Sequence, residues 1–214
     1  MKPVSTLNPP QTWIATSWED YLQSLDQLET TSGKSYYYQH HSYFDMSPIG
    51  SDHACDHSLV NYAVNLYATI QQIDFQSRDN CSYRKLGIRE AQPDLSYYIG
   101  QQADLIPYGT SIIDLDEYSA PDLVIEIAKS SLADDLGNKR LLYEEMGVKE
   151  YWVVDVENAR IIAFKIFEQG SQRIQTSLVL PDLDLKIINS ALQQSRHHNH
   201  RVVCQSLMSQ FQSL

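Results

Sequence analysis

The chain has 214 residues, of which 43% are hydrophobic and 20% charged, and its formal net charge is −11. This length and composition are those of an ordinary globular protein with one sizeable core. The charge excludes a protein that coats nucleic acid with a globally basic surface, so any contact with nucleic acid requires a local basic patch or bound metal ions.

Helical and strand-like patterns alternate through the first half of the chain. A loose leader is expected up to Pro10 and a turn over 30–34, and Ser17 is a candidate N-cap. A loop over 47–56 precedes the second helix, and a connecting stretch extends from 101 to 118. The expected helices and strands are a helix over 13–28, a strand or hairpin over 35–46, an amphipathic helix over 57–73, and strands over 81–88 and 94–99.

The most informative stretch of the second half is the apolar run over 123–127. Its β-branched residues are typical of a central strand that is covered on both faces. Glu126 lies within this run, where an ionised carboxylate is costly unless a cation or hydrogen-bond donors meet it. The next segment, 132–146, has helical spacing, and Lys139 falls in its apolar stripe. A lysine on the sheet-facing side of a helix, next to a buried glutamate, indicates a site.

The remaining patterns complete a mixed α/β fold with one central sheet. They predict strands over 151–155 and 159–167, a strand-like segment over 176–180 and helices from Leu185 onward. We expect a single domain over 1–214, with an N-terminal helix in 1–34, a core over about 35–168, and a C-terminal strand and helical tail over 169–214.

The apolar runs and the cysteines of the chain indicate where in the cell the protein is located. No apolar run approaches membrane-spanning length, and the first residues lack the layout of a signal peptide. The three cysteines, Cys55, Cys81 and Cys204, are far apart, which fits neither a disulfide framework nor a zinc site. We therefore expect a cytoplasmic protein with reduced thiols that does not bind membranes.

The acid best placed to share a metal ion with Glu126 is Asp94. Asp122 lies on the same strand as Glu126 but about 13 Å away, which is too far for one ion. Asp94 begins another predicted strand. If that strand neighbours the central one, the two backbones lie only about 4.8 Å apart, and the two carboxylates can converge on a hard cation such as Mg²⁺. Lys139 would add a positive charge. Two carboxylates, a divalent ion and a lysine suit phosphodiester hydrolysis, since the ion activates water and both cations stabilise charge on the phosphate.

The segment PDLVIEIAKSSLADDLGNKRLLYEEMGVKEYWVVD (121–155) resembles the bacterial restriction-endonuclease-like family of the PD-(D/E)XK nuclease superfamily. The upstream Pro93-Asp94 and the loop Met46-Ser47-Pro48, which leads to His57, are similar to family positions too. The positions of the segment that carry the resemblance are Pro121, Asp122, Glu126, Asp135, Lys139, Tyr143, Gly147, Val148, Glu150, Tyr151 and Trp152.

The resemblance spans most of the chain and implies an αβββαβ nuclease core, a mixed central sheet flanked by helices. It implies that Asp94 and Glu126 bind Mg²⁺ (or Mn²⁺) and that Lys139 is the catalytic lysine, moved from strand to helix. It also implies nucleic acid, DNA in particular, as the partner, and it is compatible with a homodimer. The accessory candidates are Asp122, His57, Asp135 and Tyr143.

A second interpretation is a catalytically weak or inactive nuclease-like module with an interaction or regulatory role. The chain has Ala128 where the superfamily has its lysine, and His41-Ser42 where the family has Gly-Glu. In that interpretation Glu126 and Lys139 form a structural salt bridge.

The other candidates have structural alternatives as well. Asp94 follows a proline and suits a turn, and Asp135 and Lys139 have the spacing of an ordinary helix pair. Tyr143 suits core packing, and His57 suits a helix cap.

Overall fold

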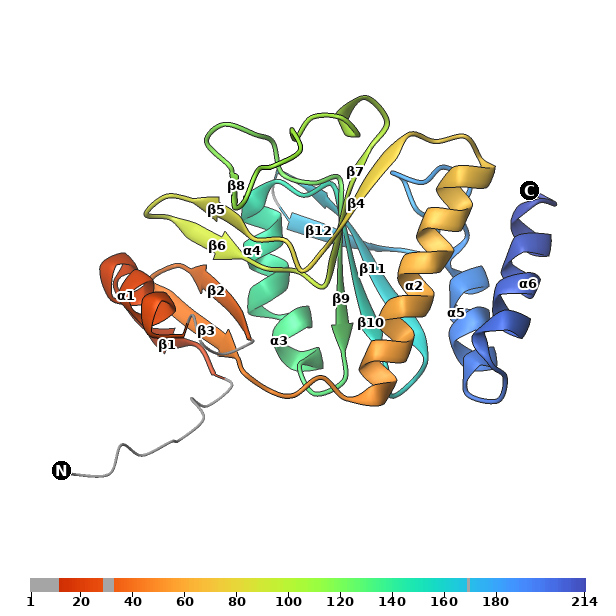
Figure 1. Ribbon diagram of the computed structural model, residues 1–214, viewed down its shortest axis with the longest axis horizontal. Helices are drawn as coiled ribbons and strands as arrows, with labels where there is room; N and C mark the ends of the chain where they lie inside the picture. Colours follow the sequence, from red (N-terminus) through yellow and green to blue (C-terminus); the bar gives the residue numbers. More distant parts are fainter. Residues whose placement is uncertain (1–11, 29–32, 169) are drawn as a thin grey trace.

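A sheet of six strands, in the order β12-β11-β10-β9-β7-β4, lies at the centre of the fold (Figure 1). This computed structural model describes residues 12–28, 33–168 and 170–214. Strand β9, one of the two innermost strands of this sheet, pairs in parallel with β10 and antiparallel with β7, and every residue of β9 and β10 is buried. The predicted central strand is therefore confirmed. The six strands are β4 (Phe75–Asp79), β7 (Leu95–Ile99), β9 (Leu123–Ala128), β10 (Glu150–Asp155), β11 (Arg160–Phe167) and β12 (Gly170–Ile174).

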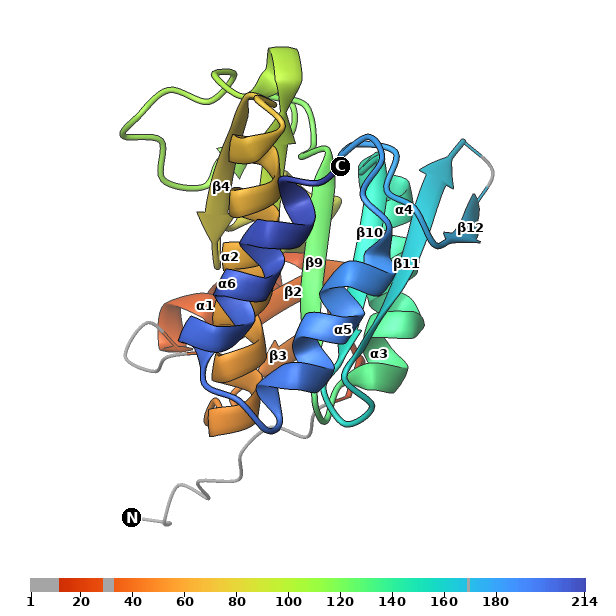
Figure 2. The same cartoon turned by 90° about the vertical axis from the view of Figure 1, so that its right-hand side faces the viewer.

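Helices cover both faces of this sheet (Figures 1 and 2). On one face α2 (Ser51–Ile70), α5 (Leu185–Ser195) and α6 (His200–Phe211) pack over the sheet, and on the other lie α3 (Leu132–Leu136) and α4 (Asn138–Met146). Side chains alternate along β9, so Ile125 and Ile127 enter the core under α2, whereas Val124 and Ala128 enter the core under α4. By the same alternation Glu126 faces the side of α4.

A second sheet, in the order β1-β3-β2-β6-β5-β8, lies beside the first. It extends the predicted hairpin, since β2 and β3 pair antiparallel and bury Tyr36, Tyr37 and Tyr43. The mixed α/β class is thus confirmed, with two sheets where the sequence predicted one. The strands are β1 (Ile14–Ala15), β2 (Lys34–Tyr38), β3 (His41–Asp45), β5 (Tyr83–Lys85), β6 (Arg89–Ala91) and β8 (Ile113–Asp114).

The first two helices begin at other residues than predicted. Ser17 is the N-cap of α1 (Trp18–Leu28), because its hydroxyl accepts a bond from the Asp20 amide at 3.1 Å, but the preceding residues form β1. Helix α2 begins at Ser51 rather than at residue 57. Asp56 is therefore inside this helix, where it is buried and pairs with Arg196 at 2.6 Å.

The helix predicted over 132–146 is divided into α3 and α4 at Gly137. This residue has φ −103° and ψ −108°, and a Cβ atom built on it would lie 2.9 Å from the Ala133 carbonyl oxygen. Only glycine avoids that contact without a shift of the backbone, so Gly137 allows the chain to break the helix at this position.

Smaller differences concern the connections. The strand-like segment over 176–180 forms a single bridge between Thr176 and Asp184, and the strand is β12 instead. The connection over 101–118 begins within the short 3₁₀ helix η1 (Gly100–Gln102) and contains β8. The predicted leader and most of the turn over 30–34 lie outside the described residues. Among the helices of the described ranges, none is long and apolar enough to span a membrane.

Candidate active site

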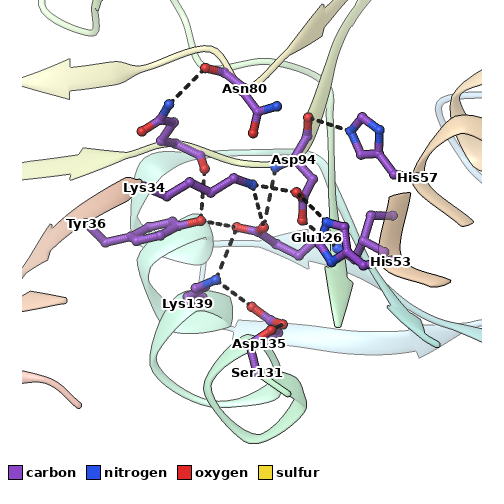
Figure 3. Close-up of polar contacts among 12 residues, drawn as sticks. Lys34, Tyr36, His53, His57, Asn80, Asp94, Glu126, Ser131, Asp135 and Lys139 are labelled. Atoms are coloured by element: carbon purple, nitrogen blue, oxygen red, sulfur yellow. Dashed lines mark hydrogen bonds and ion pairs between the residues drawn. The ribbon is translucent and has the colours of Figure 1, made fainter. Parts of the chain in front are cut away.

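A cavity of about 930 Å³ lies between β2, the loop before α2, the end of β9 and α4. Its lining includes all three residues that the sequence predicted as catalytic, Asp94, Glu126 and Lys139. Lys34 and His53 line the same cavity beside them (Figure 3).

The strand register brings the two carboxylates together. Strand β7 runs antiparallel to β9 with Leu95 opposite Ile125, so Asp94, one residue earlier, lies next to Glu126. The Asp94 amide is 3.4 Å from Glu126 Oε2, and Asp94 Oδ2 accepts a bond of 2.7 Å from the amide of Ile127. The predicted adjacency of these strands is confirmed, and the backbone of β9 fixes the Asp94 carboxylate.

Glu126 is held by donors on its other oxygen. Tyr143 donates to Glu126 Oε1 at 2.7 Å, the Tyr36 hydroxyl lies 3.1 Å from the same atom, and Lys139 Nζ is 3.8 Å away. Only 1% of Glu126 is exposed. Burial raises the pKa of Glu126 to about 7, although Lys139 and Lys34 oppose this shift.

The pKa of Asp94 is shifted in the opposite direction from that of Glu126. Burial disfavours its ionised form, but the positive charge of Lys34 and a hydrogen bond with His53 outweigh burial, so the pKa of Asp94 lies well below its usual value. Lys34 Nζ is 2.5 Å from Asp94 Oδ1, and His53 Nε2 is 3.3 Å from the same atom.

Lys139 is buried and paired. Its ammonium lies 2.8 Å from Asp135 Oδ1 and 4.3 Å from the centre of the Tyr36 ring. Burial disfavours its charged form, but Asp135 and Glu126 outweigh burial and hold the pKa of Lys139 well above its usual value. Asp135 is fixed in turn, because Ser131 donates to its Oδ2 at 2.6 Å. The predicted pair of Asp135 and Lys139 therefore exists, and it belongs to the same network as Glu126.

Two of the accessory candidates lie at the margin or outside the cavity. His57 Nε2 is 3.3 Å from the backbone oxygen of Asp94, and its ring stacks on that of His53 at 6.3 Å. Asp122 is not brought to the site: its carboxylate pairs with Lys149 at 2.6 Å and accepts a bond of 2.7 Å from the Ile99 amide.

Sequence reasoning missed Lys34 and His53. His53 was placed in a loop, although its spacing of four residues from His57 would have indicated one helix face if the helix had been expected to begin earlier. Lys34 gave no local signal, because its position beside Asp94 depends on how the second sheet packs against the first.

The donor set fits a hard divalent cation. Asp94 and Glu126 each present one oxygen, Oδ1 and Oε2, on the side of Lys34. When all are ionised, the carboxylates of Asp94, Glu126 and Asp135 outnumber the ammonium groups of Lys34 and Lys139, which favours an additional cation. Within the described ranges no three His, Cys, Asp or Glu side chains form a closed metal centre, and Mg²⁺ needs no such cage, because it commonly binds through one or two carboxylates and keeps several waters.

Two comparisons show which known proteins this chain resembles. A family profile described as Uma2, "Putative restriction endonuclease", matches residues 18–200. The solved structure of a protein from Anabaena variabilis ATCC 29413, described as a "putative nuclease belonging to DUF820", is similar with a TM-score of 0.56 and 17% sequence identity. The match covers 82% of this chain and 98% of that one, and at this identity it supports the fold alone. No curated protein matches the chain.

Proposed function

This chain belongs to the Uma2 family of putative restriction endonucleases, and from that premise we propose that it is a metal-dependent nuclease that hydrolyses phosphodiester bonds in DNA. The observation that carries the proposal is the convergence of Asp94 and Glu126 in an open cavity with Lys139 3.8 Å from Glu126. Asp94 and Glu126 would hold Mg²⁺ or Mn²⁺, which when bound supplies Lewis-acid polarisation of the phosphate and an activated water.

The protein's own residues supply orientation and charge. The Ile127 amide and the Tyr143 hydroxyl fix the directions in which the carboxylates of Asp94 and Glu126 point. Lys139, which is kept protonated by Asp135, stabilises the negative charge that develops on the phosphate during hydrolysis. Because these groups are held before the substrate arrives, little reorganisation accompanies the reaction.

DNA reaches this chain of net charge −11 through a local site rather than a basic surface. Lys34, Lys129 and Lys139 line the cavity and give it the positive side chains that phosphates require. We also propose that the chain is a single domain, that it forms a homodimer and that it is cytoplasmic.

The test is cleavage of supercoiled plasmid, linear duplex and RNA by the full chain in Mn²⁺. Replacing Glu126→Gln or Lys139→Met is expected to lower the rate at least 100-fold, since each removes a charged group beside the reacting phosphate. Asp122→Asn is the matched control, because Asp122 is a buried carboxylate that contacts Lys149 outside the cavity, and it should keep most of the rate. Equal rates in all variants would contradict the proposal, and preferential cleavage of RNA would correct its substrate.

A second candidate is the weakly active or inactive nuclease-like module. The contact of Lys34 with Asp94 favours it, because an ion pair already neutralises one of the proposed metal ligands. Calorimetric titration separates the two: binding of Mn²⁺ that is lost in Glu126→Gln supports the nuclease, and no binding at millimolar Mn²⁺ supports the module.

A further inference from the structure

Lys34 lies next to the carboxylate pair, and so far it has been assigned only a general contribution to the positive charge of the cavity. Its Nζ atom is 2.5 Å from Asp94 Oδ1 and 4.0 Å from Glu126 Oε2. Figure 3 shows the side chain reaching in from β2 so that its ammonium group contacts both carboxylates. Lys139, by contrast, approaches Glu126 through the other oxygen, Oε1.

The oxygens that Lys34 approaches are those that remain for a metal ion. Asp94 Oδ2 already accepts from the Ile127 amide, and Glu126 Oε1 already accepts from Tyr143. Asp94 Oδ1 and Glu126 Oε2 both face Lys34. Their other contacts are longer, 3.3 Å from His53 to Asp94 Oδ1 and 3.4 Å from the Asp94 amide to Glu126 Oε2, so each oxygen keeps capacity for a cation in the cavity.

We propose that Lys34 is an internal cation that competes with the divalent metal ion for Asp94 and Glu126. The inference rests on the proposed function, since the metal is the one assigned there. Mg²⁺ binds oxygen at about 2.0–2.1 Å and repels an ammonium group at the same carboxylate, so the ion and the Lys34 contact exclude each other. Metal binding must displace Lys34, and the apparent metal affinity is correspondingly weaker.

The surroundings of Lys34 allow this displacement. Its side chain is 16% exposed and lines the cavity, whereas the Lys139 side chain is 3% exposed and is held by Asp135 at 2.8 Å. A lysine carries its charge on a flexible four-carbon stem, so the ammonium of Lys34 can move into the cavity without a change in the backbone.

The experiment is calorimetric titration of the chelator-treated full chain with Mn²⁺ alone. Lys34→Met is expected to bind Mn²⁺ at least tenfold more tightly than the wild type, which corresponds to about 1.4 kcal/mol. Lys34→Arg, which keeps the charge, is expected to bind like the wild type. Lys34→Gln is a second uncharged variant, which replaces Lys34→Met if thermal melting shows that the methionine variant does not fold.

Lys149→Met is the matched control. Lys149 also contacts a buried aspartate, Asp122, at 2.6 Å, but outside the cavity, and its removal changes the net charge by the same amount. Its Mn²⁺ affinity should stay within about twofold of the wild type, because exposed charges at a distance are screened. An equal gain in Lys149→Met would attribute the effect to net charge and overturn the proposal.

The remaining outcomes separate this inference from the proposed function. The tight site of Lys34→Met must disappear when Glu126→Gln is added, since otherwise the ion binds elsewhere and the competition is refuted. If the wild type binds Mn²⁺ and Lys34→Met binds it equally or more weakly, the competition is refuted and the nuclease proposal stands. No binding in any variant at millimolar Mn²⁺ removes the nuclease proposal, and the competition with it.

Discussion

Glu126 is a glutamate inside a fully buried strand, and its neighbours explain how the fold tolerates it. A buried ionised carboxylate is costly, but Tyr143, Tyr36 and Lys139 all contact Oε1. The Tyr36 hydroxyl also lies 2.8 Å from the Gln92 carbonyl oxygen, so its single proton is divided between two acceptors. The Tyr143 hydroxyl donates to Glu126 at 2.7 Å. The stability of the protein should therefore depend on Tyr143.

Tyr143→Phe removes this donor and little else. We expect a loss of about 1.5–3 kcal/mol in the free energy of unfolding, the range for hydrogen bonds to charged groups. Urea unfolding at pH 8 with a chelator measures it. Tyr97→Phe is the control, since the hydroxyl of the buried Tyr97 donates to the neutral Asn61 at 2.8 Å, and the loss in this variant should be about 0.5–1.5 kcal/mol. Equal losses would mean that Glu126 is not held as a charged acceptor.

Individual site residues differed in how well the sequence predicted them. Asp94 and Glu126 could be paired because the sequence indicates a strand directly after Asp94 and another that contains Glu126, and Lys139 could be added because it interrupts an apolar helical stripe. Lys34 and His53 could not, because their positions depend on contacts between segments that are distant in sequence.

Among the elements, the break between α3 and α4 has a single-residue cause that can be tested. Gly137→Ala would place a Cβ atom 2.9 Å from the Ala133 carbonyl oxygen, so the backbone must shift. We expect a loss of about 1–3 kcal/mol in the free energy of unfolding, the usual cost of overpacking. A shift there also moves Asp135 relative to Lys139, which lie on either side of the break.

Gly50→Ala is the matched control for that substitution. Gly50 has φ −78°, and a Cβ atom at this position would meet nothing within 4 Å. The Gly50→Ala variant should lose less than about 1 kcal/mol in the free energy of unfolding, the typical cost of a less favourable residue at a helix N-cap. Urea unfolding of both variants checks the pair, and a Gly137→Ala protein as stable as Gly50→Ala would show that the break is not required by sterics.

Long, strongly patterned elements were predicted well, and short ones were not. Strands β9 and β10 have continuous apolar runs, and α5 and α6 have clear amphipathic spacing. Strand β8 has two residues and β5 and β6 have three each, too few for a periodic pattern to be visible. The start of α2 was placed too late because Asp56 has the sequence context of an N-cap, whereas its partner is Arg196.

In the molecule as a whole, that same ion pair connects the C-terminal helices to the helix that carries His53 and His57. Arg196 bonds both oxygens of Asp56 at 2.6 Å, and the Asp56 side chain is fully buried. Arg196→Met leaves this carboxylate buried without a counter-ion. The expected loss is about 3–5 kcal/mol in the free energy of unfolding.

Arg160→Met is the comparison for that loss. Arg160 pairs with the buried Asp155 at 2.9 Å, but Asn158 also donates to Asp155, and more than half of the Arg160 side chain is exposed. Its removal should cost about 1 kcal/mol or less. Urea unfolding monitored by circular dichroism measures both variants, and similar losses would mean that Arg196 is not the essential counter-ion of Asp56.

The reversal of strand direction between β7 and β9 constrains how this chain can vary. Asp94 meets Glu126 only because antiparallel pairing sets the residue before β7 opposite the fourth residue of β9. Inserting one residue between Asp94 and Leu95, which is already paired with Ile125, would turn the aspartate to the opposite face of the sheet. Related sequences should therefore differ in length freely in the loop before β8, but keep a fixed count of residues from Asp94 to the end of β7.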